Sequence, residues 1–519
     1  MVKKISLLLA VLMAASVFAS CQTVDTVVDD GTVSGTASAA ADNSAGNEET
    51  AGSEGASVQA GSGQTASGAK ASSGSTASNS NDPNYGKLRE DKVVDMKGYE
   101  FVIGSPWLKN AQNESTTLAE SLFYQRRKEV ETAYNCKIKV EYFYPDQATM
   151  LPKIMGNQKI ADVINMSMSM MIPAALLGQI VPLNETKGIY VDDARWVDAY
   201  TNISTINNKV YGLNFNRPPE ARGCLFYNKD MIKNSSKITE DPQELALKGQ
   251  WTYEKFRAMC IAATQDLNND GTPDKYGFMP VNVDTTPYMF TMANDAPLVV
   301  KDSSGKWVEN FNSQKFINAA NFYYKLVNED KVTKIWDNQR KEATFNDDKF
   351  QDSLKFFADG NVAFISAESW LGCKQLKPLS NKVNYGILPI PKGPDAKEYY
   401  SFCDNGNVFC ITSTNKDVEK TVTIFNAVAR PLKDHEGEDW WQQDVQTEYF
   451  RAGDVNSTKL YKMILDSSRM DIGCGVADLS KGVGNIFRNA VYWRNDTMTS
   501  MLKASQGNYD IYLKALLNK

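Results

Sequence analysis

The chain has 519 residues, and its 56 basic and 62 acidic side chains give a net charge of −6 at pH 7. Seven acids against one lysine between residues 22 and 80 account for −6, and two lysines near the start contribute +2, so the rest of the chain carries only −2. Nucleic-acid binding requires a basic surface, and a nearly neutral body therefore argues against it. A single histidine argues against multi-histidine metal sites and Cys/His catalysis.

Residues 1–20 are typical of a lipoprotein signal peptide. Lys3 and Lys4 precede an apolar stretch, Ile5 to Ala19, that is too short to span a bilayer comfortably. A small pair, Ala19 and Ser20, then stands before Cys21, as in a bacterial lipobox, although Phe18 replaces the usual leucine. We expect acylation of Cys21 with a fatty acid such as palmitate; simple cleavage or a retained helix are the alternatives.

Residues 21–84 consist almost entirely of glycine, serine, alanine, threonine and acids. Such a segment cannot bury enough apolar surface to offset its ordering entropy, so we expect a disordered tether. The roughly 430 residues that follow are too many for one core and suit two lobes.

The eight cysteines include no CxxC pair, and seven remain if Cys21 carries a lipid. An odd remainder does not describe a disulfide framework, so we expect buried, small apolar residues.

The pattern after residue 95 alternates between strands and helices. Strands are expected at 99–103, at 136–142 and at 162–166, with helices at 118–133 and 173–179 between and after them. A helix at 251–265, capped by Thr252, strands at 362–366 and 385–390, and a helix near 418–428, capped near Thr414, continue the pattern. This alternation of strands and helices predicts an α/β fold with parallel strand pairing. The last eighty residues are predicted to be helical.

Four segments resemble family 1 extracellular solute-binding proteins, the group that contains maltose-binding protein. They are LFYNKD at 225–230, WTYEKF at 251–256, GNVAF through ESW at 360–370, and YGILPIPKGP at 385–394. Their order and spacing are specific for the fold and class and much less so for the ligand.

The resemblance implies a two-lobe, periplasmic-binding-protein-like (type II) fold with hinge strands and a C-terminal helical segment. Lobe one would comprise 95–215 plus 409–445, and lobe two 225–400 plus 450–519. The chain would cross between lobes near 214–224, 402–407 and 446–455.

A sugar presents hydroxyl rims and apolar C–H faces, so its site needs flat aromatic side chains and two-way hydrogen-bonding groups. The resemblance places Trp370 and Tyr288 at stacking positions, and Trp107 follows the first strand. The alternative for each ring is a core anchor. The polar candidates are Ser167, Ser169, Glu368, Asp404 and Asn405, each of which could instead be a satisfied turn or cap.

Residues 266–274, DLNNDGTPD, resemble an EF-hand calcium loop. Asp266, Asn268, Asp270, Thr272 and Asp274 supply the metal-ligating positions, and Gly271 stands at the turn. Gly277 replaces the usual bidentate glutamate, which should weaken the site. We expect a structural Ca²⁺ site, with a solvated Asx-rich turn as the alternative and no catalytic cofactor.

These observations predict a monomeric, non-enzymatic, lipid-anchored protein on the extracytoplasmic face of the cell membrane. It would capture a carbohydrate, an oligosaccharide, for the permease subunits of an ABC importer and would not bind nucleic acid. The alternatives are the same fold with a peptide or polyamine ligand, a tethered glycoside hydrolase that pairs Glu368 with Asp404, and a surface adhesin.

Overall fold

The computed structural model describes residues 84–108, 117–216, 219–221, 223–283, 285–336, 347–403, 406–436, 438–475, 484, 486–494, 496–504, 507, 510 and 513–518. All of these described residues belong to one compact unit, Gly74–Lys519. Within the described residues, no helix combines the length and apolar character that a membrane crossing requires.

The first of two four-stranded sheets has the order β13-β3-β1-β2. Its strands are β1 (Tyr99–Gly104), β2 (Cys136–Glu141), β3 (Val163–Ser167) and β13 (Asn407–Cys410). β1 is parallel to β2 and β3, whereas β13 is antiparallel to β3. The strict alternation of buried and exposed residues in β2 confirms the half-exposed strand predicted there.

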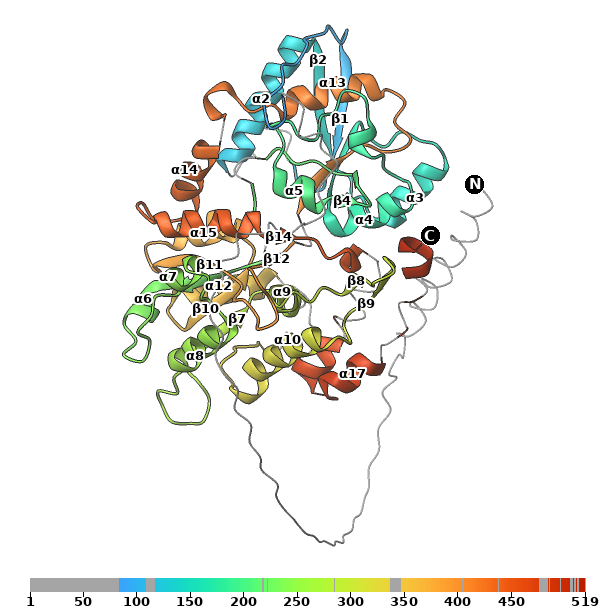
Figure 1. Ribbon diagram of the computed structural model, residues 1–519. Coiled ribbons are helices and arrows are strands. Elements are labelled where there is room, and N and C mark those ends of the chain that lie inside the picture. Colours follow the sequence, from blue (N-terminus) through green and yellow to red (C-terminus); the bar gives the residue numbers. More distant parts are fainter. Residues whose placement is uncertain are drawn as a thin grey trace, which may run out of the picture. The chain divides into compact units, whose positions relative to one another are not determined.

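Helices α2 (Leu118–Tyr134) and α13 (Val418–Ala429) pack against one another beside β1 and β2 (Figure 1). α2 begins with a capping box, in which the Thr117 hydroxyl accepts the Glu120 N–H and the Glu120 carboxylate accepts the Thr117 N–H. The other elements of this region are α3 (Gln147–Met155), α4 (Met168–Leu176), η2 (Leu183–Glu185), α5 (Asp198–Ile203), β4 (Thr205–Ile206) and β5 (Lys209–Val210).

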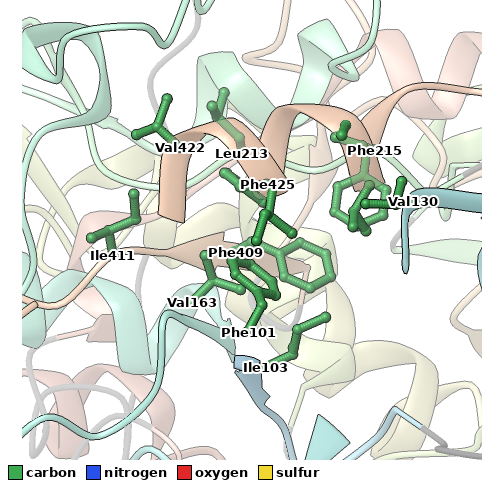
Figure 2. Packing of buried hydrophobic residues seen from close by; sticks show 14 of the residues in the cluster. Phe101, Ile103, Val130, Val163, Leu213, Phe215, Phe409, Ile411, Val422 and Phe425 are labelled. Carbon is green, nitrogen blue, oxygen red and sulfur yellow. The ribbon is translucent and has the colours of Figure 1, made fainter. Parts of the chain in front are cut away.

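An apolar core joins segments that are far apart in the sequence, as Figure 2 shows. The Phe409 ring of β13 stacks on Phe215 at 4.6 Å and lies 6.1 Å from Phe425 of α13. Phe101 and Ile103 of β1 are fully buried in the same cluster. Burial of these aromatic rings, at roughly 25 cal/mol per Å² of apolar surface, holds β13 and α13 against the first strands.

The second sheet has the order β11-β6-β10-β7, and every residue of its strands is buried. Its strands are β6 (Cys224–Asn228), β7 (Tyr276–Pro280), β10 (Val362–Ala367) and β11 (Tyr385–Pro389). β10 is parallel to β7, and β6 is antiparallel to both β10 and β11. Burial on both faces explains why these strands read as continuous apolar runs in the sequence.

Helices surround the second sheet, with α8 against β7 and β10 and α15 against β11 (Figure 1). The Thr252 hydroxyl caps α8, as predicted. The elements of this region are α6 (Lys229–Lys233), α7 (Pro242–Leu247), α8 (Tyr253–Ala263), α9 (Thr286–Ala293), β8 (Val299–Lys301), β9 (Trp307–Glu309), α10 (Gln314–Tyr324), η3 (Lys325–Glu329), α12 (Asp347–Ala358), η4 (Gly372–Leu376) and η5 (Lys377–Leu379).

The last part of the described chain is largely helical. Its elements, after α13, are η6 (Lys433–His435), α14 (Glu438–Tyr449), α15 (Val455–Asp466), β14 (Ser468–Arg469), η7 (Ile472–Gly475), η8 (Arg488–Trp493), α17 (Met498–Ala504) and η9 (Leu513–Leu517). β14 pairs in parallel with β12 (Ser401–Phe402). Cysteines 136, 224, 260, 403, 410 and 474 are buried, as predicted.

Candidate functional site

The segments that run between the two sheets lie against one another. The Asn214 side-chain amide, shortly after β5, donates a hydrogen bond of 2.6 Å to the Asn407 carbonyl. Gly223, just before β6, has φ +61°, and a Cβ built there would lie 2.8 Å from the Phe402 carbonyl oxygen. Only glycine fits this backbone at this distance. The crossing segments, 214–223 and 402–407, therefore pack in direct contact.

Ser167 and Ser169 lie beside one of these crossing segments. β3 ends at Ser167 and α4 begins at Met168, so the two serines flank the first residue of that helix. Their hydroxyls are 3.0 Å apart, and the Met168 N–H between them donates a 3.1 Å hydrogen bond to the Gly406 carbonyl. A pair of hydroxyls thus sits at the carboxyl end of a central strand, where α/β sheets bind ligands.

Glu368 and Trp370 lie beside the other crossing segment. Both follow the carboxyl end of β10, and the buried Ser369 between them donates its N–H to the Ala221 carbonyl at 3.1 Å. The Trp370 indole N–H donates to Glu368 Oε2 at 2.7 Å, and both side chains are half-buried. The carboxylate therefore fixes the orientation of the indole ring.

Tyr288 is in α9 and only 5% exposed. Its ring lies 6.0 Å from that of Phe402 and 5.7 Å from that of Phe487, so it packs against a crossing segment and against the start of η8. The Thr286 and Ser366 hydroxyls, 2.7 Å apart, hold α9 to β10. Neither Phe402 nor Phe487 was predicted as a site residue, although Phe402 is the first residue of the predicted crossing at 402–407.

Trp107 follows β1 and is 40% exposed. The Ser105 hydroxyl accepts the N–H groups of Trp107 and Leu108, both at 3.1 Å, and this turn positions the indole at the carboxyl end of the first sheet. Asp404 and Asn405, the remaining ligand candidates, lie outside the described residues.

Contacts therefore gather several candidate residues around the crossing segments. Trp370 follows Ser369, whose N–H bonds to the crossing residue Ala221. The ring of Tyr288 packs on Phe402 of the other crossing segment. Ser167 and Ser169 flank Met168, whose N–H bonds to Gly406 of that same segment. An oriented indole together with hydroxyl groups can bind an uncharged, hydroxyl-rich solute by stacking and two-way hydrogen bonds.

One buried carboxyl supports this region. Asp471, between β14 and η7, accepts the backbone N–H of Leu298 at 2.5 Å and that of Gly473 at 2.9 Å. Burial raises the pKa of Asp471 to about 6, and the backbone hydrogen bonds oppose that shift. These two bonds give the side chain a structural role at the junction of η7 and the β8 segment.

The predicted calcium loop follows α8 and is exposed. Its carboxylates accept backbone N–H groups from within the loop: Asp266 from Asp270 and Gly271, Asp270 from Thr272, and Asp274 from Leu267. The Asn268 side chain bonds to Asp270 at 3.0 Å.

Gly277, at the position of the missing glutamate, has no room for a side chain, since a Cβ would lie 2.3 Å from the Cys260 carbonyl oxygen. Across the described ranges, no three His, Cys, Asp or Glu side chains are grouped so as to hold a metal ion. The loop is folded as a series of Asx turns, and its potential metal-coordinating oxygens all come from one short segment. In the described residues, its side chains do not surround a metal position.

The chain matches the family of bacterial extracellular solute-binding proteins over residues 125–432, and it belongs to that family. A maltooligosaccharide ABC transporter solute-binding lipoprotein of Streptococcus pneumoniae (strain ATCC BAA-255 / R6) is 25% identical over 253 residues, which are 48% of this chain and 52% of that protein. The chain thus spans about half the length of the curated relatives it matches.

Solved structures share the fold over most of this chain. The GacH receptor of Streptomyces glaucescens GLA.O, solved without ligand and with acarbose, has a TM-score of 0.55 at 15% identity, over 81% of this chain and 98% of that one. The cyclic α-maltosyl-1,6-maltose binding protein of Arthrobacter globiformis has a TM-score of 0.57 at 12% identity, over 80% of this chain and 99% of that one. The predicted type II binding-protein fold is confirmed.

Proposed function

We propose that the protein captures a carbohydrate, most simply an oligosaccharide, and delivers it to an ABC importer. The observation that carries this proposal is the placement of Trp370 and the two serines beside the crossing segments. The names of the relatives support the same class of ligand, because they refer to maltooligosaccharides, acarbose and cyclic α-maltosyl-1,6-maltose.

The proposed mechanism is capture by closure. The sugar docks on one lobe, the crossing segments bend, the second lobe closes over it, and the closed form engages the permease subunits. Micromolar affinity requires about −8 kcal/mol, which a few stacked rings and buried hydrogen bonds can supply. The protein would act as a monomer held on the extracytoplasmic face of the membrane by a lipid on Cys21.

A thermal-shift screen of the purified protein against mono- and oligosaccharides, peptides and polyamines tests the ligand class. We expect one saccharide series to raise the unfolding temperature in a concentration-dependent way. Stabilisation by a peptide or polyamine alone would contradict the carbohydrate proposal.

The competing hydrolase function needs two carboxylates across the sugar. In this structure the Glu368 carboxylate already accepts the Trp370 indole N–H, which favours a positioning role. Incubation of the stabilising oligosaccharide with the protein, followed by chromatography, should return the oligosaccharide intact. A shortened product would support the hydrolase instead.

The proposed lipid attachment at Cys21 is tested in a separate experiment. Expression in a bacterial host with labelled palmitate should label the wild-type chain and leave the Cys21→Ala variant unlabelled and released from the membrane fraction. Equal labelling of both chains would refute acylation at Cys21.

A further inference from the structure

At the edge of the first sheet, the candidate residue Trp107 lies near two exposed tyrosines, Tyr142 and Tyr144, that the sequence did not predict as ligand residues. Trp107, Tyr142 and Tyr144 are 40%, 79% and 44% exposed, and they are three of the six exposed aromatic residues in the described chain. A cluster of exposed aromatic rings marks an interaction site more often than a single ring does.

The backbone brings the two aromatic segments together. β1 and β2 pair in parallel up to Gly104 and Glu141, so Trp107 and the tyrosines leave the sheet at the same edge. Beyond the paired strands, the Ser105 N–H donates to the Glu141 carbonyl at 2.9 Å, and the Phe143 N–H donates to the Ser105 carbonyl at 3.4 Å.

The outward direction of the two tyrosines follows from the same segment. Phe143 packs over Gly104, where an added Cβ would be 3.4 Å from the Phe143 Cβ. In an extended chain, neighbouring side chains point to opposite sides, so Tyr142 and Tyr144 face away from Phe143. The Asp146 N–H donates to the Tyr144 carbonyl at 3.0 Å, and the adjacent Pro145 is buried, which fixes the segment in place.

Resting on the proposed function, we infer that Trp107, Tyr142 and Tyr144 form an outer sugar-binding subsite that makes the protein select extended oligosaccharides over short ones. Each ring offers an apolar face together with a hydroxyl or N–H group, the combination that sugar rings require. Among the described residues, none of the three rings stacks on another aromatic ring or on a cation.

The sheet order sets the length of the ligand. Ser167 ends β3, Trp107 follows β1 and Tyr142 follows β2, and these strands are consecutive neighbours. At about 4.8 Å per strand step, roughly 10 Å separates the end of β3 from the end of β2. One sugar ring cannot reach from the serines to the tyrosines, whereas a chain of several rings can.

Isothermal titration calorimetry tests the subsite with the full-length protein, a Tyr142→Ala/Tyr144→Ala double variant and maltooligosaccharides of two to seven units. Manno-oligosaccharides replace them if the thermal-shift screen selects that series. We expect wild-type affinity to rise with chain length. The double variant should lose about tenfold for the longest ligand and less than twofold for the shortest.

A Tyr85→Ala variant is the control, because Tyr85 is 47% exposed but lies on the segment before β1. It should bind every ligand as the wild type does. Equal losses at all chain lengths in the double variant would overturn the inference, because the tyrosines would then act on the main site.

Unchanged binding at every length would also overturn the inference and would leave a protein partner as the occupant of these rings. Absence of any saccharide binding to the wild type would overturn the proposed function itself, and the subsite with it.

Discussion

The indole N–H of Trp370 donates a 2.7 Å hydrogen bond to the carboxylate of Glu368, two residues earlier on the same strand end. Because this N–H is engaged within the protein, a bound sugar would meet the ring face of Trp370 and not its hydrogen-bond donor. Glu368 therefore matters for affinity through the orientation that it gives to the ring.

Replacement of Trp370 by alanine should weaken saccharide binding by at least about tenfold, since the stacking surface is lost. Trp370→Phe should retain part of the affinity, and Glu368→Gln, which keeps an acceptor for the indole, should lose less than Glu368→Ala. Calorimetric titration measures all four. Wild-type affinity in Trp370→Ala would exclude this ring from the site.

Tyr288 should contribute mainly to stability. The Tyr288→Ala variant removes a buried ring from its contacts with Phe402 and Phe487, and we expect a loss of about 3 kcal/mol in the free energy of unfolding. Tyr288→Phe keeps the ring and should stay close to wild type. Urea denaturation provides the measurement. If the alanine variant lost sugar affinity at wild-type stability, Tyr288 would be a ligand residue and not a core anchor.

Stability should fall between about pH 4 and pH 7 because of Asp444 in α14. Burial, with a smaller contribution from Glu448, raises the pKa of Asp444 from 3.8 to about 7, and its Oδ2 is buried without a described partner. The folded state thus holds a proton that the unfolded chain releases near pH 4, so stability is full below that pH and is lost as the pH rises toward 7.

In urea titrations, Asp444→Asn should remove most of this pH dependence, and Glu448→Gln should remove a smaller part. A wild-type midpoint that does not change between about pH 4 and pH 7 would contradict the raised pKa of Asp444.

Because the crossing segments are in close contact, substitution of Gly223 by alanine should destabilise the fold more than the same substitution at Gly249. Gly223 and Gly249 both have positive φ, +61° and +72°, but an added Cβ meets the Phe402 carbonyl only at Gly223 and meets nothing within 4 Å at Gly249. Gly249→Ala should cost about 1 kcal/mol, and Gly223→Ala at least about 1 kcal/mol more. Equal urea midpoints would show that the Phe402 segment can move away without cost.

The loop at 266–274 should bind calcium weakly, in the millimolar range, because the bidentate ligand is missing. At a dissociation constant of about 1 mM, 10 mM Ca²⁺ would stabilise the fold by about 1.4 kcal/mol. A thermal-shift titration with calcium and with EDTA measures this effect, and Asp266→Asn should remove it. An unfolding temperature that is insensitive to both reagents would exclude a functional ion here.

The local patterns predicted most of the strands but not every helix boundary. The alternation after Cys136 and the cap at Thr252 were confirmed. The helix predicted from Pro173 instead begins at Met168. Met168, Met171 and Ile172 are buried, and this short, mostly apolar stretch shows no clear helical period in the sequence.

The cap predicted near Thr414 was also wrong, since α13 begins at Val418 and the Thr414 hydroxyl bonds to Thr412. A cap is a local hydrogen bond, and a nearby hydroxyl can take that bond instead.

The environment of the candidate site depends on contacts between distant parts of the chain, which no local pattern contains. Tyr288 meets Phe402 and Phe487, more than a hundred residues downstream. Trp370 could be placed after a strand end, but the neighbouring bond between Ser369 and Ala221 could not be foreseen.

The two sheets also differ in how far along the sequence their strands are spread. All four strands of the second sheet lie between Cys224 and Pro389, whereas β3, which ends at Ser167, acquires its partner β13 only at Asn407. Contacts across long separations form slowly, because the intervening loop must close first. The second sheet can therefore assemble as an uninterrupted stretch of chain, while the first must wait with an exposed β3 edge until residues beyond 407 have emerged and folded back.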